Sequence, residues 1–507
     1  MVRSDVADLL FVGGPVYFGR GRVGETAVAV RDGRIQVGVE QPAKEVIDLR
    51  GRMLLPGFQD SHVHAVSAGI TLGQCELAAA RTVDMCVQAV ADYARQHPHL
   101  AWITGSGWSN DVFAQGLPAH NPLDDILPDR PAFLIDRHRR TALVNSRALE
   151  LAGIDELSRE QLGSLDCDPD DVRIGLLRGD AVGSVARLVP EPTEAEQIAG
   201  LVRAQRMLHS FGITAWQDAL LGPERDLADP GEAYLAAAES GLLTARVSGA
   251  LWWDPDRGVE QIGELHARRE RLSHPLLQAS AVRIAVGDTK AVATQPNGGN
   301  QCIDGSVESG ELRNIVTLLD AQGFQLHFQL ADDRGSREAL AAVESARRAH
   351  GERGNRHHLA RTEAVRPADI PRLAELGVAV TLCSPTTVAD GQFPFAELRA
   401  CGAILAIGSD WPVGEPDPWR GIQAQLGRND PADPDAAGTL ADLVDAYTVG
   451  SAHVNHADDS GRIATGHRAD LVVLDRNPFE RSAVELGQVG VDLTFVAGEL
   501  VHASANV

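Results

Sequence analysis

Short apolar segments separated by glycine occupy both ends of the chain. Residues 8–50 contain LLFVGGPVYFG, TAVAVRDGRIQVG and EVIDLRG, and the pair Asp32-Gly33 supplies the positive φ values that a tight hairpin turn needs. The C-terminal stretch contains LVVLD and then VDLTFVAGELVHA. Each set is too short to stand alone, so we expect residues 1–57 and 456–507 to form one small composite β domain.

Apolar runs of strand length alternate with segments of helical periodicity over residues 58–455. The apolar runs are PAFLID, GITAWQDA, VRIAVGD, FQLHFQL, VAVTLC and AILAIGSD, and the helical segments include EAEQIAGLVRAQRMLHSFG and SREALAAVESARRAH. Strands that are apolar on both faces and separated by helices are typical of parallel βα units. At this length the pattern favours an α/β fold with a (β/α)8 TIM-like barrel. Loop-rich residues within about 72–200 indicate an insertion.

The composition excludes several classes of protein. Of the 507 residues, 44% are hydrophobic and 23% are charged, which is typical of a soluble globular protein. The 70 acidic and 46 basic side chains give a net charge of -24, which opposes binding to nucleic acids or anionic membranes. No apolar stretch reaches membrane-spanning length, and the N-terminus lacks the pattern of a secretory signal. We therefore expect a cytoplasmic protein that binds a small molecule.

Two motifs place polar side chains at the ends of predicted barrel strands. In PGFQDSHVHA, His62 and His64 are two residues apart, so both imidazoles point to the same side of a strand. At the C-terminal mouth of a barrel they could bind one divalent metal ion together. In AILAIGSDWPVGEP, Asp410 ends an apolar run, where a carboxylate is costly to bury without a cation or hydrogen-bond donors. Asp410 is therefore a candidate ligand or general base, with a helix N-cap as the alternative.

The order of motifs along nearly the whole chain resembles the amidohydrolase superfamily. The matching segments are PGFQDSHVHA, GWSNDVF, LPDRPAFLIDRHRRTALVNSRALELAGI, HSFGITAWQDA, VRIAVGD, LAIGSDWPV and GHRADLVVLDRNPF. The most similar branch is the amidohydrolase family 3 group, which includes N-substituted formamide deformylases. This resemblance implies a (β/α)8 barrel, a composite β-sandwich built from both termini, and metal-assisted hydrolysis of an amide or related C–N bond. It also makes a homodimer reasonable.

The lysine that bridges two metal ions in that family is replaced. Only Lys44 and Lys290 are lysines among the 46 basic residues, and the family pattern VKxxxDG is matched by VRIAVGD with Arg283 at the lysine position. Arginine stays protonated and cannot be carboxylated. Two metal ions beside this charge would be electrostatically unfavourable, so we expect no binuclear centre.

Other positions also depart from the pattern that the resemblance implies. In the segment that matches HxHAIGD, His327 is retained, whereas Gln329 replaces the liganding histidine. Arg361 replaces the last histidine of HRIEH, and Arg140 replaces a substrate-side histidine. We interpret Arg140, Gln329 and Arg361, with Arg283, as substrate-binding residues that favour an acidic group on the substrate.

The retained and altered positions leave three hypotheses. The first is a hydrolase that cleaves an amide, formamide or lactam bond. The charge argument favours a metal-free version, in which Arg283 and Arg361 pair with Asp410 and polarise the carbonyl. Its acid–base groups would be the histidines at positions 62, 64 and 327.

In the metal version of this hydrolase, a single divalent ion such as zinc is held by the three matching ligands, which are His62, His64 and Asp410. The second hypothesis is an inactive homologue retained for small-molecule binding or assembly. The third is a non-hydrolytic enzyme that uses the same pocket.

Overall fold

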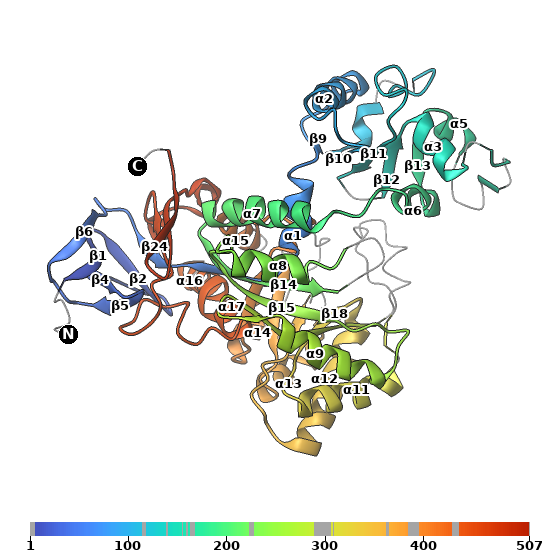
Figure 1. The fold of residues 1–507 in the computed structure, drawn as a ribbon. Coiled ribbons are helices and arrows are strands. Elements are labelled where there is room, and N and C mark those ends of the chain that lie inside the picture. The colour runs from blue at the N-terminus through green and yellow to red at the C-terminus, as the bar shows by residue number, and fades with distance from the viewer. Residues whose placement is uncertain are drawn as a thin grey trace.

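A computed structural model gives the fold of the chain. It describes residues 6–113, 118–137, 140–154, 156–158, 161–162, 168–222, 228–287, 306–307, 309–360, 365–383, 395–427 and 436–505. Within these residues the chain forms three parts: a central barrel, an added lobe and a terminal β domain (Figure 1).

Eight parallel strands build the central barrel. In chain order they are β8 (Phe58–Val63), β14 (Ile213–Leu221), β15 (Arg246–Trp252), β17 (Leu277–Val286), β18 (Gln325–Leu330), β19 (His358–Ala360), β20 (Ala379–Cys383) and β21 (Leu405–Gly408). Each strand pairs in parallel with the next one in this list, and β21 lies against β8. All nine residues of β14 are buried, as expected for a strand with packed side chains on both faces. The predicted TIM-like barrel is confirmed.

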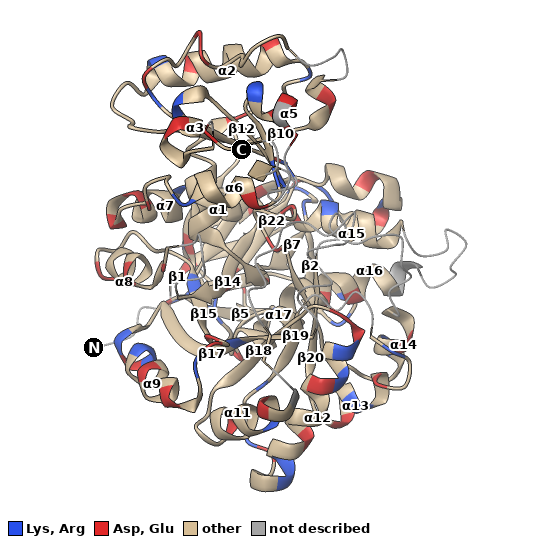
Figure 2. Ribbon diagram, turned by 90° about the vertical axis from the view of Figure 1, so that its right-hand side faces the viewer, with Lys and Arg blue, Asp and Glu red and all other residues tan. Residues whose placement is uncertain are grey.

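Helices surround the barrel. In chain order they are α1 (Ala65–Thr71), α7 (Glu194–Ser210), α8 (Gly231–Glu239), α9 (Ile262–Arg271), α11 (Ser309–Ala321), α12 (Asp333–His350), α13 (Ile370–Glu375), α14 (Phe395–Ala400), α15 (Pro418–Leu426), α16 (Ala436–Asp445) and α17 (Ser451–Val454). The two helical segments expected from periodicity are α7 and α12. A capping box of Thr193 and Glu196 begins α7. Charged residues lie along the outer helices, among them α9 and α12 (Figure 2). The buried residues of α12 are mostly apolar, so this helix packs an apolar face against the barrel.

The two chain ends share the terminal β domain, as the sequence predicts. One sheet has the order β5-β4-β1-β6 and the other has the order β24-β23-β22-β7-β2-β3. Their strands are β1 (Ala7–Val12), β2 (Pro15–Gly19), β3 (Arg22–Glu25), β4 (Val28–Arg31), β5 (Arg34–Val37), β6 (Ala43–Asp48), β7 (Leu54–Pro56), β22 (Leu471–Leu474), β23 (Val491–Val496) and β24 (Glu499–Ala503). Phe11 and Phe495 meet edge to face at 5.3 Å in their common core. Asp32 and Gly33 have φ values of 50° and 71° in the predicted hairpin turn.

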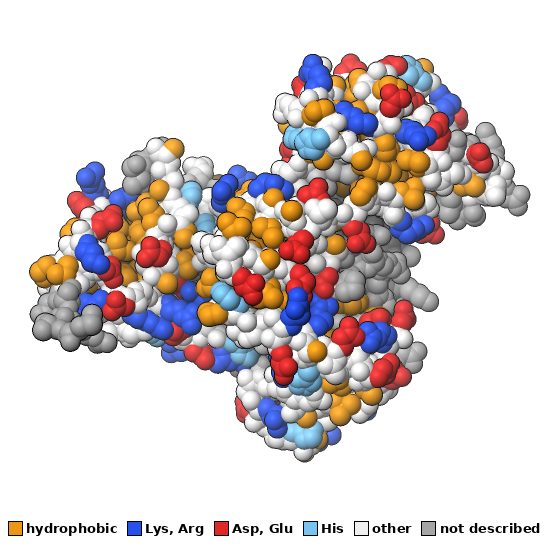
Figure 3. Space-filling model, viewed as in Figure 1, with side chains coloured by type: hydrophobic (Ala, Val, Ile, Leu, Met, Phe, Trp, Pro, Cys, Tyr) orange, Lys and Arg blue, Asp and Glu red, His pale blue; other side chains and the backbone are white. Residues whose placement is uncertain are grey.

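A separate sheet forms the added lobe, at the upper right of Figures 1 and 3. Its order is β13-β12-β11-β10-β9, with β9 (Cys75–Glu76), β10 (Ile103–Trp108), β11 (Ala132–Asp136), β12 (Thr141–Val144) and β13 (Leu176–Arg178). The helices of the lobe are α2 (Val83–Gln96), α3 (Ser146–Ala152), α5 (Pro169–Arg173) and α6 (Asp180–Ala186). The run PAFLID therefore lies in this sheet and not in the barrel, and it packs into a core of its own around Trp108 and Leu134.

No helix in the described part of the chain is both long enough and apolar enough to cross a membrane. On the face shown in Figure 3, acidic and basic side chains are interspersed.

His209, near the end of α7, links the barrel to the terminal β domain. Its Nδ1 donates to the Ile213 carbonyl and its Nε2 accepts from the Thr244 hydroxyl, both at 2.9 Å. Its own carbonyl accepts from the Thr494 hydroxyl at 2.7 Å. The side chain is 2% exposed. Burial lowers the pKa of His209 to about 4, so the folded protein holds this imidazole neutral at physiological pH.

Replacing His209 should flatten the dependence of stability on pH. The unfolded chain binds more protons than the folded one between the ordinary pKa of 6.5 and the folded pKa of about 4. The contribution is therefore fully present above pH 6.5 and is lost as the pH falls toward 4. Between pH 7.5 and 5.0, His209→Gln should lose about 2 kcal/mol less unfolding free energy than the wild type, measured by denaturant unfolding. An equal slope in His209→Gln and in the wild type would contradict the account.

Candidate metal centre

Three side chains at the mouth of the barrel form a group that could hold a metal ion. His62 lies at the end of β8, His64 follows that strand, and Asp410 lies two residues beyond β21. Their ligand atoms lie within 4.8 Å of one another. Asp410 Oδ1 is 3.4 Å from His62 Nε2 and 3.7 Å from His64 Nε2. The structure thus brings together the three residues that the sequence singled out as potential ligands.

The backbone around β8 and β21 sets this arrangement. The Asp410 amide donates to the His62 carbonyl at 2.8 Å, and the His64 amide donates to the Trp411 carbonyl at 2.9 Å. Gly408 allows the close approach, because a Cβ at this position would lie 2.5 Å from the Cβ of His62. Asp410 has a φ of 53°, a conformation that Asp adopts more readily than most residues.

Asp60 connects the backbone of β8 to the backbone after β21 at the same junction. Its Oδ1 accepts hydrogen bonds from the His62 and Ser409 backbone amides, both at 3.0 Å. Burial raises the pKa of Asp60 to about 7, and the nearby Asp410 adds to the rise. Asp60 therefore positions the backbone of two ligand-bearing segments, and it does not belong to the ligand group itself.

A layer of buried polar side chains lies behind His62. His62 Nδ1 is 2.9 Å from His327 Nε2, and His327 Nδ1 is 2.8 Å from Gln217 Oε1. The same amide oxygen is 2.9 Å from His358 Nε2, and His358 Nδ1 is 2.9 Å from the Thr381 hydroxyl. His327 is thus close to the metal group but contacts it through His62.

The imidazoles of His64, His327 and His358 are held neutral. Burial lowers the pKa of His64 to about 3, and the charges of His62 and Arg283 add to the fall, against the pull of Asp410. Burial also brings the pKa values of His327 and His358 well below the usual range. Neutral imidazole is the form that binds a metal ion, whereas it cannot serve as a general acid. The environment therefore suits ligation better than proton donation by these histidines.

The remaining predicted site residues lie in different parts of the structure, some on barrel strands and one in the added lobe. Arg283 is 3% exposed on β17, in register with His327, and its guanidinium lies 5.5 Å from the Trp252 ring. Gln329 is 2% exposed on β18, and its amide oxygen has no hydrogen-bond partner within the described ranges. Arg140 lies between β11 and β12 in the added lobe. Arg361 lies outside the described residues.

Sequence reasoning did not single out Gln217 or Thr381. Both are completely buried polar residues on barrel strands, and both contact the histidines behind the metal group. A polar residue inside an apolar run such as GITAWQDA was the available signal. Because adjacent residues of a strand point to opposite sides, only one of the two adjacent histidines at positions 357 and 358 faces inward. His358 does so, whereas His357 contacts Asp320 on α11 at 3.1 Å.

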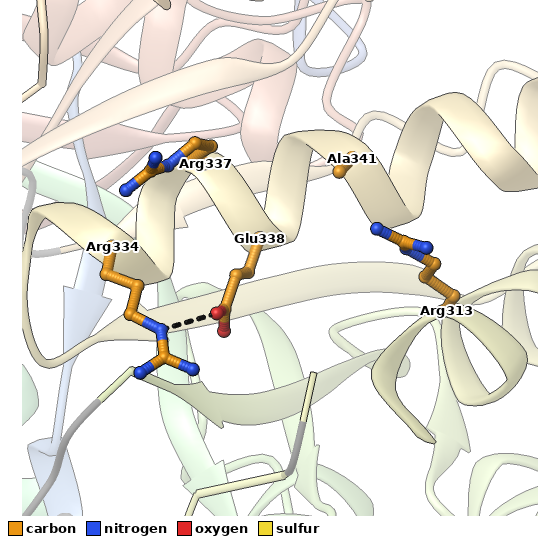
Figure 4. A pocket seen from close by; sticks show the side chains of 5 residues that line it. All are labelled: Arg313, Arg334, Arg337, Glu338 and Ala341. Carbon is orange, nitrogen blue, oxygen red and sulfur yellow. Dashed lines mark hydrogen bonds and ion pairs between the residues drawn. The ribbon is translucent and has the colours of Figure 1, made fainter. Parts of the chain in front are cut away.

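A surface hollow of about 380 Å³ lies elsewhere, between α11 and α12. Figure 4 shows Arg313 of α11 facing α12, where Arg334 and Glu338 form an ion pair of 2.6 Å. The hollow lies between outer helices and includes none of the candidate ligands.

Comparisons with known proteins show which family the chain belongs to. The chain is 26% identical over 545 residues to the protein LONG AFTER FAR-RED 3 of Arabidopsis thaliana, covering 98% of this chain and 92% of that protein. It is 25% identical over 523 residues to the N-substituted formamide deformylase of Arthrobacter pascens, covering 94% of each chain.

Solved structures share the fold. An uncharacterised metal-dependent hydrolase from Pyrococcus furiosus superimposes with a TM-score of 0.70 at 22% identity, covering 93% of this chain and 100% of that one. The sequence profile of the amidohydrolase family, family 3, matches residues 45–502. The chain therefore belongs to amidohydrolase family 3, as its motifs predict.

Proposed function

We propose that this protein is a hydrolase that cleaves a C–N bond of a small molecule and uses one divalent metal ion, held by His62, His64 and Asp410. The convergence of their ligand atoms at the barrel mouth carries the proposal. Two imidazoles and a carboxylate, with a position left for water or substrate, are a donor set that suits catalytic zinc. The low pKa of His64 supports ligation, since the nitrogen needs no deprotonation at neutral pH.

Arg283 and Gln329 favour one ion over two. Arg283 places a permanent positive charge on β17 next to His327 and close enough to His64 to lower its pKa. A second cation there would be repelled at low dielectric. The amide oxygen of Gln329 is a weak ligand compared with an imidazole nitrogen. We infer that this side of the pocket binds substrate.

The chemistry divides between the ion and the protein. A divalent ion at this site would act as a Lewis acid toward a carbonyl oxygen and make water more acidic. Gln329 offers a buried acceptor for an N–H group of the substrate. Arg283 offers a fixed positive charge for a substrate oxygen or carboxylate. Asp410 holds the ion, which leaves its carboxylate less suited to act as the general base.

The substrate class follows from the family and from the pocket charge. The deformylase of Arthrobacter pascens is named for N-substituted formamides, so formamides are the first class to test, followed by amides and lactams. Arg283 favours members of each class that carry an acidic group.

The purified protein should bind about one zinc ion per chain by elemental analysis and competition titration. His64→Ala should weaken binding by at least about 100-fold, because loss of a direct ligand exceeds the 10–100-fold effect of changing a residue behind one. The exposed His99→Ala should bind as the wild type does. A wild-type protein without tight binding that still hydrolyses substrate would contradict the single-ion site and favour catalysis by the arginines.

Hydrolysis should be measured on matched formamides, amides and lactams with and without a carboxylate. We expect turnover that incorporates labelled oxygen from water, is abolished by a chelator and returns with zinc. Asp410→Asn should reduce kcat/KM by about 10³-fold or more, since an ion and its ligand act as one unit.

Three outcomes would contradict the proposal in different ways. Substrate consumption without oxygen incorporation would indicate non-hydrolytic chemistry. Ligand binding without turnover across the panel would indicate an inactive homologue. Full activity in Asp410→Asn would show that the chemistry occurs elsewhere.

A further inference from the structure

An unbroken series of hydrogen bonds leads from Gln325, at the start of β18, to the candidate metal group. Gln217 Nε2 donates to Gln325 Oε1 at 2.9 Å, and Gln217 Oε1 lies 2.8 Å from His327 Nδ1. His327 Nε2 lies 2.9 Å from His62 Nδ1. All four side chains are at most 1% exposed, so water does not compete for these contacts.

The contacts of Gln325 determine which group donates and which accepts in each of these hydrogen bonds. Gln325 Nε2 donates to the carbonyls of Arg356 and Val454, both at 2.8 Å. A carbonyl can only accept, so the atom of Gln325 that faces these two groups must be its amide nitrogen. Its oxygen then faces Gln217 and must accept. Gln217 therefore presents its nitrogen to Gln325 and its oxygen to the histidines.

The orientation of Gln217 determines which nitrogen of His327 carries a proton. The amide oxygen of Gln217 accepts from His327 Nδ1 and from His358 Nε2, because an amide oxygen has no proton to give. In neutral His327 the other nitrogen, Nε2, is then an acceptor. His62 Nδ1 must donate to it, so whenever the His62 ring is neutral its lone pair is on Nε2, the atom that faces Asp410.

The surroundings of His327 support its neutral form. The side chain is completely buried, and Arg283 is its partner in the register of β17 and β18. Among the described residues, no carboxylate forms an ion pair with His327. An imidazolium in this place would be a buried charge next to a second positive charge, which is energetically costly.

We propose that Gln217 is a positioning residue for the metal ligand His62: acting through His327, it selects the tautomer that presents Nε2 to a divalent ion at the Asp410 side of the pocket. This inference rests on the proposed single-ion site. It gives the buried histidines of β18 and β19 a role that differs from direct ligation, since their nitrogens are engaged by Gln217, Thr381 and His62. Residues behind a ligand commonly fix its tautomer and raise metal affinity.

The tautomer can be measured without metal or activity. Protein labelled with ¹⁵N at histidine should show His62 with a pyrrole-type Nδ1 and a pyridine-type Nε2, assigned by loss of the signals in His62→Gln. Gln217→Met, which has a similar shape but no amide, should give a mixture of tautomers. A wild-type His62 that is protonated on Nε2 would overturn the inference, and this result does not depend on whether Gln217→Met folds.

Metal affinity gives the second readout. Gln217→Met should weaken zinc binding by about 10–100-fold. Gln217→Glu should restore affinity to within a few-fold of the wild type, because a neutral carboxylic acid can donate to Gln325 and accept from both imidazoles. Equal affinity in the Met variant and the wild type, or no rescue by Glu, would overturn the inference.

Gln205→Met is the matched control. Gln205 is another buried glutamine, on helix α7, which donates to the Leu242 carbonyl and accepts from the Thr244 amide. Its replacement should lower stability but leave the His62 tautomer and zinc affinity unchanged, whereas an equal loss of affinity would show a merely structural effect. If the wild type binds no zinc but shows the expected tautomer, the single-ion function fails while the role of Gln217 in setting the tautomer stands. If the wild type binds zinc tightly and Gln217→Met has no effect, the single-ion function stands and the role of Gln217 fails.

Discussion

Two reciprocal backbone hydrogen bonds join the first and last barrel strands at the point where the candidate ligands meet. The amide of Asp410 donates to the His62 carbonyl, and the amide of His64 donates to the Trp411 carbonyl. Ligands from the two ends of the barrel, almost 350 positions apart in sequence, therefore meet by the same contacts that close the sheet. The lack of a side chain at Gly408 and the positive φ of Asp410 are local conditions for this closure. The stability of the fold and the geometry of the site thus depend on one junction.

Electrostatics then divides the mouth of the barrel into two sides. On one side, His62, His64 and the carboxylate of Asp410 form the group that could hold one metal ion. On the other side, Arg283 supplies a permanent charge near His64 and His327. The charge of Arg283 disfavours two metal ions but does not oppose one ion on the Asp410 side, because a carboxylate there offsets part of the charge of that ion. This distinction is the reason to favour a single-ion hydrolase over a metal-free one.

The sequence predicted those features that follow from short-range patterns. Period-two spacing predicted that His62 and His64 point to the same side, and both approach Asp410, although His64 lies one residue beyond β8. Helical periodicity located α7 and α12. The apolar run PAFLID was correctly predicted as a strand, but an apolar run does not specify which sheet it joins. This strand belongs to the added lobe and not to the barrel. The role of Gln217 was invisible for a related reason: its partners come from β18 and β19, so their contact exists only after barrel closure. The pairing of Arg361 with Asp410 stays a prediction.

The most direct measurement is the anomalous X-ray signal of zinc in crystals of the protein grown with the metal. The account predicts one peak per chain, at about 2.0–2.2 Å from His62 Nε2, a nitrogen of His64 and a carboxylate oxygen of Asp410. Three results would contradict it: two zinc peaks per chain with the second near β17, coordination through His62 Nδ1, or no peak in a protein that is active.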